Sequence, residues 1–522
     1  MAEDPGRSPR RGPRGARRGP ATRGSARHAR CAARLRAGAP HPPGLDGPGA
    51  AAPPPDRPRR SPGARRGADP MKHPLPFEEI SPWVEAPEDP QPPLASDLRA
   101  DVVVVGGGYT GLSTALSLRA QGADVVLLEQ GFAGSGASGR NAGHLTPTIG
   151  KDIPTLLRFF GRERAAGLVR FADVAVEATE EVIRKHGIEC EYRASGNIMA
   201  GVHRKHEARL RTAAGRAAEL GAQVRFLDEG EMRERGLPAA FRSGVLEERG
   251  GTLHPGRYVM GLRRAALAAG VRLFESSALI ALDEGPKVTA RTSRGSVEAA
   301  NVVLATNAYT PATGRHKRRV APLRVSLFET EPLGEAQLAE LGWRGREGIY
   351  TAHETLESFR LTERNTIVGG SKVVRYAWGS GLAPGYDPPA FRAIEGAFRE
   401  RFPTLADLPI AHFWGGWIGL TLDFLPTLGV GGAHRNLFFG LGYAGHGVAQ
   451  ATLMGAMLAE RIQGREHEHE VALRRRELSW PPEPLRWLGA KLIINALTAL
   501  DRRTDRQVRS ALRDGTGPGE RA

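Results

Sequence analysis

Apolar and polar positions alternate along the chain in two periods, which separate predicted strands from predicted helices. Four consecutive valines at 102–105, bounded by glycines, are typical of a parallel strand that is buried on both faces. Apolar residues within 112–116 then recur at helical spacing, and Gly122 is placed to end this helix. A second apolar run at 125–128 predicts another buried strand, so this stretch forms a strand–helix–strand unit.

The rest of the chain continues this alternation of strands and helices. Helical spacing of apolar residues predicts helices at 151–186, 205–220, 229–236 and 256–269, and another after the glycine turn at 442–448. Strand-like patterns occur at 190–202, 271–275, 278–283, 287–293, 296–300, 302–307, 324–330, 357–361 and 437–440. Such alternation is typical of an α/β fold.

A glycine-rich turn joins the first strand to the first helix. Gly106, Gly108 and Gly111 fit the G-x-G-x-x-G pattern, in which the glycines permit a tight turn, a close pyrophosphate and close helix packing. Glu129 follows the second strand, 18 residues after Gly111, where its carboxylate can accept from a ribose hydroxyl. The pattern predicts a site for FAD or NAD rather than NADP. The alternative is a glycine-rich turn with no ligand.

Two further glycine-rich segments extend this predicted site. Residues 134–144 are rich in glycine and serine directly after the second strand, which suggests backbone that runs along a ligand; a plain surface loop is the alternative. Residues 442–448 form a second glycine turn that opens a second helix. The N-terminus of that helix can face the negative charge of a reduced flavin, a feature that NAD enzymes do not need. These segments favour FAD.

The net charge of +16 would suggest a nucleic-acid or membrane partner, but most of this charge lies in the first 70 residues. Residues 1–70 hold 16 Arg and five acids, so +11 belongs to them and +5 to the other 452 residues. We interpret this segment as disordered, with Met71 as the true start and the preceding residues as upstream sequence translated in error. An RNA-binding or targeting arm is the rival, but it lacks interleaved aromatic residues. We therefore expect no nucleic-acid partner.

Cysteine content and hydropathy bear on the compartment. Cys31 and Cys190 provide neither a disulfide framework nor metal-ligand spacing, so we expect a cytoplasmic protein without a metal site. No apolar run reaches 18 residues, and no signal-peptide core follows the N-terminal arginines. A peripheral position on a membrane stays open.

A helix predicted at 485–500 follows the proline cluster 481–484. Its predicted apolar stripe consists of Leu485, Leu488, Leu492 and Ile493. We expect this stripe to cover apolar surface on the protein's own body or on a second subunit. The alternative is a helix that lies on a membrane surface.

Five motifs together resemble the D-amino-acid-oxidase-like family of FAD-dependent oxidoreductases, and within it most closely the gamma-glutamylputrescine oxidoreductases. The matching stretches are 103–112, 136–141, 303–308, 423–426 and 442–447. The resemblance runs from about 95 to 465 and does not extend to 1–70. It implies an α/β fold in which a discontinuous Rossmann-like FAD-binding domain carries an inserted antiparallel α+β substrate domain.

The order of the predicted elements along the chain gives the domain boundaries, and the resemblance implies the same discontinuous arrangement. The FAD-binding domain is expected at 101–150, 250–321 and 411–465, and the substrate domain at 151–249 and 322–410. Residues 71–100 are expected to form an extended N-terminal arm, and 466–522 a helical extension.

The chemistry implied by the resemblance is oxidation of a C–N bond in a small amine or amino acid. A hydride passes to flavin N5, the resulting imine hydrolyses, and oxygen or a quinone reoxidises the flavin. Sarcosine-oxidising relatives have a lysine shortly after the second glycine turn, whereas residues 448–450 are Val-Ala-Gln here, so a sarcosine-type substrate is not expected. Residues 141–144 are Asn-Ala-Gly-His where close relatives have Asn-Gly-Gly-Gln, which points to a different substrate. The alternatives are an NAD-linked dehydrogenase and a flavin-binding subunit without turnover.

Individual side chains complete these expectations. His446 and His144 are the candidate catalytic residues, with a structural role as the alternative for each. Trp417 is expected in the core, and Lys372 and Arg375 on the surface, rather than at a substrate. The predicted cofactor-binding residues are Gly106, Gly108, Gly111, Glu129, Ser138, Arg140, Asn141, Thr306, Gly445, Gly447 and Val448.

Overall fold

The computed structural model describes residues 75–513, with side chains to 510. All of these residues belong to one compact unit. The tail expected at 1–70 and the start expected at Met71 lie outside the described residues. The described part of the arm is extended, as expected, and it packs on the body through buried side chains such as Trp83 and Leu94.

The first sheet is mainly parallel and contains the buried valines of 102–105. Its main strands run in the order β17 (Thr427–Gly431), β18 (Leu437–Leu441), β11 (Ser296–Leu304), β1 (Leu98–Val105), β2 (Val125–Leu128) and β8 (Arg272–Phe274). β17 is antiparallel to β18, and the hairpin β9 (Ala281–Asp283) and β10 (Val288–Arg291) pairs antiparallel with β11. Both faces of the parallel strands are covered, which explains their uninterrupted apolar runs.

Four helices pack into one apolar cluster with this sheet. They are α1 (Tyr109–Ala120), α2 (Ile153–Lys185), α5 (Pro255–Ala268) and α8 (Gly447–Ile462). α1 packs against both α5 and α8, and α2 packs against α8 and the short α9 (Glu470–Leu473). The segment 151–249 is expected in the substrate domain. Its first helix, α2, instead buries its side chains beside those of α1 and α8.

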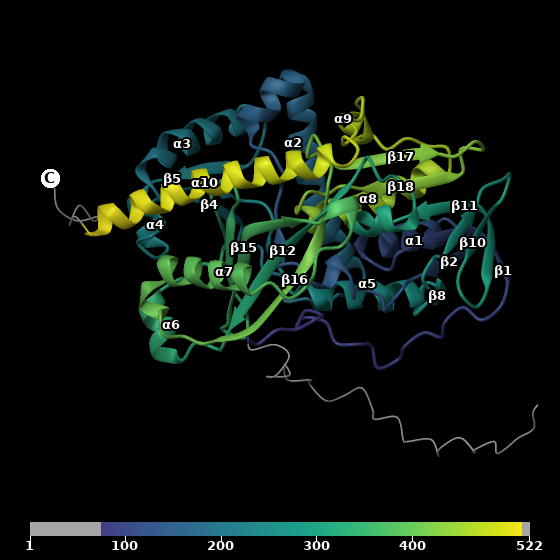
Figure 1. Cartoon of the computed structure of the whole chain (residues 1–522), viewed down its shortest axis with the longest axis horizontal. Coiled ribbons are helices and arrows are strands. Elements are labelled where there is room, and N and C mark those ends of the chain that lie inside the picture. The colour runs from purple at the N-terminus through teal and green to yellow at the C-terminus, as the bar shows by residue number, and fades with distance from the viewer. Residues whose placement is uncertain (1–74, 514–522) are drawn as a thin grey trace, which may run out of the picture. The chain divides into compact units, whose positions relative to one another are not determined.

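The second sheet is almost entirely antiparallel. Its strands run in the order β16 (Ile410–Leu420), β12 (Ala321–Thr330), β15 (Ile367–Tyr376), β14 (Glu357–Leu361), β13 (Gly348–Thr351), β4 (Asn197–Gly201), β6 (Ser243–Glu247) and β5 (Val224–Leu227). Only β13 and β4 are parallel among the described strands of this sheet. The helices beside it are α3 (Arg204–Ala218), α4 (Glu229–Glu234), α6 (Glu335–Leu341) and α7 (Pro388–Arg401), and Figure 1 shows α7 in front of β12 and β15.

Most predicted elements are confirmed within a few residues. The strands predicted at 296–300 and 302–307 are one continuous strand, β11. Of the strand-like stretch 190–202, β4 is the part that forms a strand. A two-stranded sheet pairs β3 (His144–Leu145) with β7 (Gly251–Thr252), which directly precedes α5. The structure therefore has the predicted α/β class, with one parallel and one antiparallel sheet.

The C-terminal helix α10 (Leu485–Arg513) is longer than predicted and is oriented differently. The predicted stripe Leu485, Leu488, Leu492 and Ile493 is exposed, and Leu492 keeps 62% of its surface in solvent. The expectation that this stripe covers apolar surface is therefore wrong for the chain by itself. The opposite side of α10 docks on the second sheet through polar groups, described below. No helix within 75–513 combines the length and the hydropathy needed to cross a membrane.

Candidate functional site

A cavity of about 300 Å³ lies where β1 and β11 end and where α1 and α8 begin. Carboxyl ends of parallel strands and N-termini of helices are where doubly wound folds bind nucleotides. Nine of the predicted cofactor residues line it: Gly106, Gly108, Glu129, Ser138, Asn141, Thr306, Gly445, Gly447 and Val448. The structure therefore brings together residues that lie more than 300 positions apart in the sequence.

The first glycine turn has the geometry that its motif requires. Gly106 has a φ of +108°, a conformation that side chains disfavour. A Cβ on Gly108 would lie 2.8 Å from Ser138 Oγ, the atom that accepts from the Tyr109 N–H. A Cβ on Gly111 would lie 1.9 Å from the Gly106 carbonyl oxygen, so Gly111 lets the helix approach the strand and does not line the cavity.

Glu129 holds this turn together from the end of β2. Its two carboxylate oxygens accept from the backbone N–H groups of Gly107 at 2.7 Å and Gly131 at 2.9 Å. Burial raises the pKa of Glu129, and these two hydrogen bonds oppose the rise. A carboxylate has more acceptor positions than these two bonds use, so a ribose hydroxyl can still donate to it.

The cavity fits FAD by the kind of groups that line it. Two helix N-termini, those of α1 and α8, face one space, where phosphates and a negatively charged ring are favoured. Backbone and small side chains form much of the lining, and nothing lies within 4 Å of the position of a Cβ on Gly445. A flat ring can therefore lie against the backbone there.

Arg140 takes a different place from the other predicted cofactor residues. It lines a second cavity, and its guanidinium donates to three backbone oxygens: Ser135 at 2.7 Å, Glu79 at 2.6 Å and Gly415 at 3.4 Å. Burial lowers the pKa of this guanidinium. These bonds join the arm, the loop at 134–144 and β16. A contact between Arg140 and the cofactor stays a prediction.

The second cavity has a volume of about 310 Å³ and adjoins the first. Residues common to the two linings are Ala137, Asn141, Trp417, Ile418, Gly445 and Val448. The indole N–H of Trp417 donates to the Ala383 carbonyl at 3.2 Å, and the residue is partly exposed and lines both cavities. The expectation that Trp417 is a core residue is therefore wrong, and a role as an aromatic wall for a ligand stays a prediction.

His446, the residue before α8, lines the second cavity. Its Nδ1 lies 2.7 Å from Thr148 Oγ1, which lies 2.9 Å from Thr146 Oγ1. Burial lowers the pKa of His446 to about 4, so the ring is uncharged at neutral pH. A neutral imidazole can accept a proton from a substrate. At neutral pH too little of this ring is protonated for it to act as a proton donor.

His144 lines the same cavity from β3, with Nδ1 3.1 Å from Asn197 Oδ1. The Asn197 amide donates to the carbonyls of Leu145 and Gly251, so Oδ1 is its acceptor and His144 Nδ1 carries the hydrogen. Burial lowers the pKa of His144 to about 4. Its Nε2 is buried without a hydrogen-bond partner among the described residues. A catalytic role for His144, like that for His446, stays a prediction.

Sequence reasoning missed several residues of the second cavity, among them Tyr350, Glu354 and Phe424. The Tyr350 hydroxyl donates to Glu247, whose pKa burial raises to about 7. Tyr350 and Glu354 belong to a strand and a turn that have no motif, so no local signal marks them, whereas Phe424 lies in the motif stretch 423–426. Lys372, expected to be exposed, instead pairs with Glu357 and with Asp505 of α10; Arg375 is exposed, as expected.

Comparison with known proteins agrees with this site. The family described as FAD dependent oxidoreductase matches residues 101–461. Gamma-glutamylputrescine oxidoreductase from Escherichia coli (strain K12) is 32% identical over 375 residues, which cover 71% of this chain and 85% of that protein. The resemblance predicted from the five motifs is therefore confirmed.

Solved structures show the same fold. Glycine oxidase from Geobacillus kaustophilus superposes with a TM-score of 0.61 at 20% identity, covering 71% of this chain and 96% of the other. L-proline dehydrogenase from P. horikoshii has a TM-score of 0.61, also at 20% identity, covering 72% and 96%. The family match decides the cofactor in favour of FAD over NAD. The chain belongs to the family of FAD dependent oxidoreductases and is an enzyme of that class.

Proposed function

We propose that this flavoenzyme oxidises a C–N bond of a small amine or amino acid to an imine, which then hydrolyses. The observation that carries the proposal is the second cavity, which shares six lining residues with the first. A substrate in the second cavity would lie next to the part of the first cavity bounded by Trp417, Gly445 and Val448. The names of the similar proteins, which include an amine oxidoreductase and a glycine oxidase, support the same class of substrate.

In this proposal the first sheet binds the cofactor and the second sheet binds the substrate. Residues 101–150, 250–321 and 411–465 hold the cofactor, and 151–249 and 322–410 supply most of the substrate side. The proposed division is supported by the linings: Tyr350, Ser358 and Val374 of the second sheet line only the second cavity. Helix α2 lies in the proposed substrate segment but packs on the cofactor side, so it would join the two parts.

FAD, when bound, supplies the acceptor for the two electrons of the C–H bond beside the nitrogen. An ammonium substrate must first lose a proton, because its nitrogen needs a free lone pair to form the C=N bond. We assign this proton transfer to neutral His446, whose Nδ1 lies 2.7 Å from Thr148 Oγ1. Burial makes its imidazole a weak base, so it would pass the proton on to solvent rather than hold it. Trp417 would orient the substrate as a flat wall, and the Tyr350 hydroxyl is fixed by Glu247.

We also propose a cytoplasmic enzyme whose electrons pass on to oxygen or to a quinone. The one cysteine within the described residues, Cys190, is buried and forms no disulfide, which suits a reducing compartment. Rates of flavin reoxidation by air-saturated buffer and by a soluble quinone, measured on the reduced enzyme, would decide between the two acceptors.

The test of the proposed reaction uses the visible spectrum of the purified full-length protein. We expect oxidised-flavin absorbance and its anaerobic bleaching by at least one member of a panel of amines and amino acids. A hydroxy-acid panel serves as the control for substrate class. A yellow protein that is bleached by hydroxy acids and by no amine would contradict the C–N proposal while leaving the cofactor assignment intact.

A further inference from the structure

Helix α10 presents an apolar face to solvent along its first four turns. Its exposed residues, here called the α10 outer face, are Leu485, Leu488, Leu492, Ile493 and Leu500. Each keeps between 50% and 62% of its surface exposed. Apolar surface that gathers on one side of a helix in this way marks an interaction site more often than chance exposure does.

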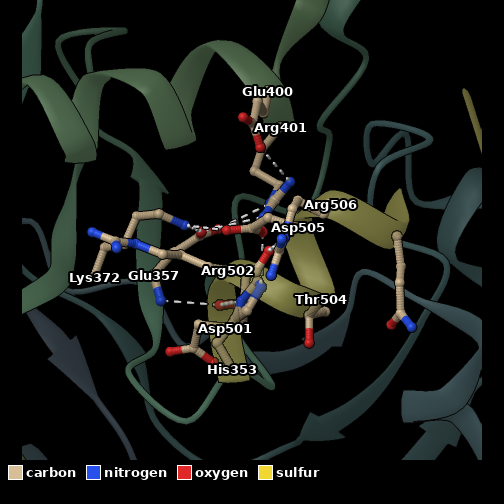
Figure 2. A network of polar contacts seen from close by, with 12 residues as sticks. His353, Glu357, Lys372, Glu400, Arg401, Asp501, Arg502, Thr504, Asp505 and Arg506 are labelled. Carbon is tan, nitrogen blue, oxygen red and sulfur yellow. Dashed lines mark hydrogen bonds and ion pairs between the residues drawn. The ribbon is translucent and has the colours of Figure 1, made fainter. Parts of the chain in front are cut away.

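The opposite side of α10 explains why the leucines point outward. Asp505 accepts from Arg401 Nη2 at 2.8 Å, Lys372 Nζ at 3.0 Å and His353 Nε2 at 3.3 Å, and Figure 2 shows these side chains converging on the helix. Burial by itself would raise the pKa of Asp505, but the His353 hydrogen bond and the two cations outweigh it and lower the pKa. Glu357 completes the network, since it pairs with the same two cations.

A second carboxylate fixes α10 one turn earlier. Asp501 accepts from the backbone N–H groups of Glu354 and Thr355, both at 2.9 Å. Rolling the helix to bury its leucines would withdraw Asp501 and Asp505 from these partners and leave Glu357 as the one described carboxylate that pairs with both Lys372 and Arg401, which is unfavourable. The orientation of α10 is therefore set by its polar side, and its apolar side needs another partner.

The charges on the exposed part of α10 have one sign. The helix contains two acids up to residue 510, Asp501 and Asp505, and both are buried. Its exposed charged side chains are Lys491, Arg502, Arg503, Arg506 and Arg509, all cationic. Of these, Arg509 pairs with Glu400. The outer face therefore combines apolar residues with a positive edge.

Neighbouring residues extend this character beyond the helix. Arg486 Nη1 donates to the Lys317 carbonyl at 2.8 Å, which places the exposed Lys317 and Arg318 beside the start of α10. Trp378 is 58% exposed, but its ring lies 6.0 Å from that of Trp487, on the side of α10 that carries Asp505 and not on the outer face. Lysine and arginine beside an apolar face can reach the phosphates at the boundary between lipid and water.

We propose that the α10 outer face docks on an anionic phospholipid surface, with the helix parallel to the membrane plane. Leucine and isoleucine would enter the boundary of the acyl chains, while the cations contact lipid phosphates. The helix lies beyond residues 101–461, the range that matches the family.

Charge disfavours two other occupants of this face. In a second copy of the chain, the facing helix would bring more cations and no exposed acid within its described residues. The segment 1–70 has a net charge of +11 and few apolar side chains, so it would be repelled rather than held. An anionic lipid surface satisfies both the apolar and the cationic residues.

The experiment is co-sedimentation of the full-length flavin-loaded enzyme with vesicles. We expect binding to vesicles of phosphatidylcholine mixed with phosphatidylglycerol, and weak binding to phosphatidylcholine alone. The double change Leu488→Gln and Leu492→Gln should weaken binding by at least about tenfold, because two leucines lose their transfer into lipid. Val471→Gln is the matched control: Val471 on α9 is 59% exposed but outside this face, and binding should not change.

A second variant separates charge from apolar contact. Changing Lys491→Gln together with Arg503→Gln should weaken binding to the anionic vesicles and flatten its dependence on salt. All variants should keep their flavin absorbance and turnover, because none of these residues lines either cavity.

Three results would overturn the proposal. The first is absence of binding by the unaltered enzyme to either kind of vesicle. The second is unchanged binding by the Leu488→Gln and Leu492→Gln variant, which would assign the binding to other cations such as those of 1–70. The third is a dimer in sedimentation velocity that this variant makes monomeric without any vesicle binding, which would assign the face to a second copy.

Discussion

The two adjoining cavities are built in different ways from one chain. The first is lined largely by backbone and small residues of glycine turns, and two of these turns open helices at the edge of a parallel sheet. The second is lined by side chains from strands as distant as β3, β12, β13 and β15, together with Phe424 and His446. A phosphate-bearing cofactor is recognised by backbone groups in a fixed local geometry, whereas a substrate is recognised by whichever side chains the packing places together.

The largest effect is expected at the first cavity. Gly108→Val should abolish FAD binding, because its Cβ would lie 2.8 Å from Ser138 Oγ, inside the cavity lining. Flavin absorbance per protein after purification measures this. Gly215→Val, on α3 where a Cβ meets nothing within 4 Å, is the control and should purify with full flavin. A fully yellow Gly108→Val enzyme would mean that the cofactor lies elsewhere.

At the second cavity, a change should affect turnover without loss of cofactor. His446→Ala should keep its flavin but lower kcat by about 100-fold, if the ring accepts the substrate proton. With a pKa near 4, His446 is neutral above about pH 5, so it should add no inflection near 6.5 to the pH profile of kcat/KM. Exposed His434 provides a control, since His434→Ala should leave the profile unchanged. Unaltered kcat and flavin potential in His446→Ala would leave this histidine a structural role.

The link between α10 and the wall of the second cavity can be tested through Asp505. Asp505→Asn should lower the free energy of unfolding by about 3 to 5 kcal/mol, because it leaves Arg401 and Lys372 short of a buried partner. Thermal unfolding measures this, with exposed Asp407→Asn as the control. KM should rise while flavin content stays the same, because loosening α10 would also disturb the bonds of Asp501 to Glu354 and Thr355, which line only the second cavity.

The pH dependence of that stability has a definite sign. The folded-state pKa of Asp505 is depressed, so its contribution is complete above its unfolded pKa of about 4. The difference between the unaltered enzyme and Asp505→Asn should therefore be constant from pH 8 to pH 5. It should shrink as the pH falls below about 4. A difference that grows in acid would contradict the ion-pair account of α10 docking.

The smallest effect concerns Glu247, which holds Tyr350 in the second cavity. Its pKa is raised by burial from about 4.5 to about 7, so the folded state binds a proton that the unfolded state releases. Stability should fall by roughly 3 kcal/mol at most as the pH rises from 4.5 through 7. Glu247→Gln should remove this fall and so raise the melting temperature more at pH 8 than at pH 5. Glu248→Gln, the exposed neighbour, should do neither.

The sequence predicted the first cavity well because its determinants are local. Gly106, Gly108 and Gly111 act through φ angles and close approaches within one turn, and Glu129 acts on the next strand of the same unit. Residues so close in the chain have their relative positions set by the strand–helix–strand geometry itself. The family motifs follow the same rule, which is why five short stretches identified the cofactor and the enzyme class.

The second cavity and the orientation of α10 were decided by tertiary structure alone. Trp417 and Tyr350 lie in apolar strand patterns that fit core residues equally well, and only the meeting of β13, β16 and the 134–144 loop makes them a wall. The stripe of α10 has the pattern of a buried face, yet Asp501 and Asp505 hold the helix by its other side. A hydrophobic pattern shows which residues favour burial, but buried ion pairs with distant strands determine which side of a helix meets the protein.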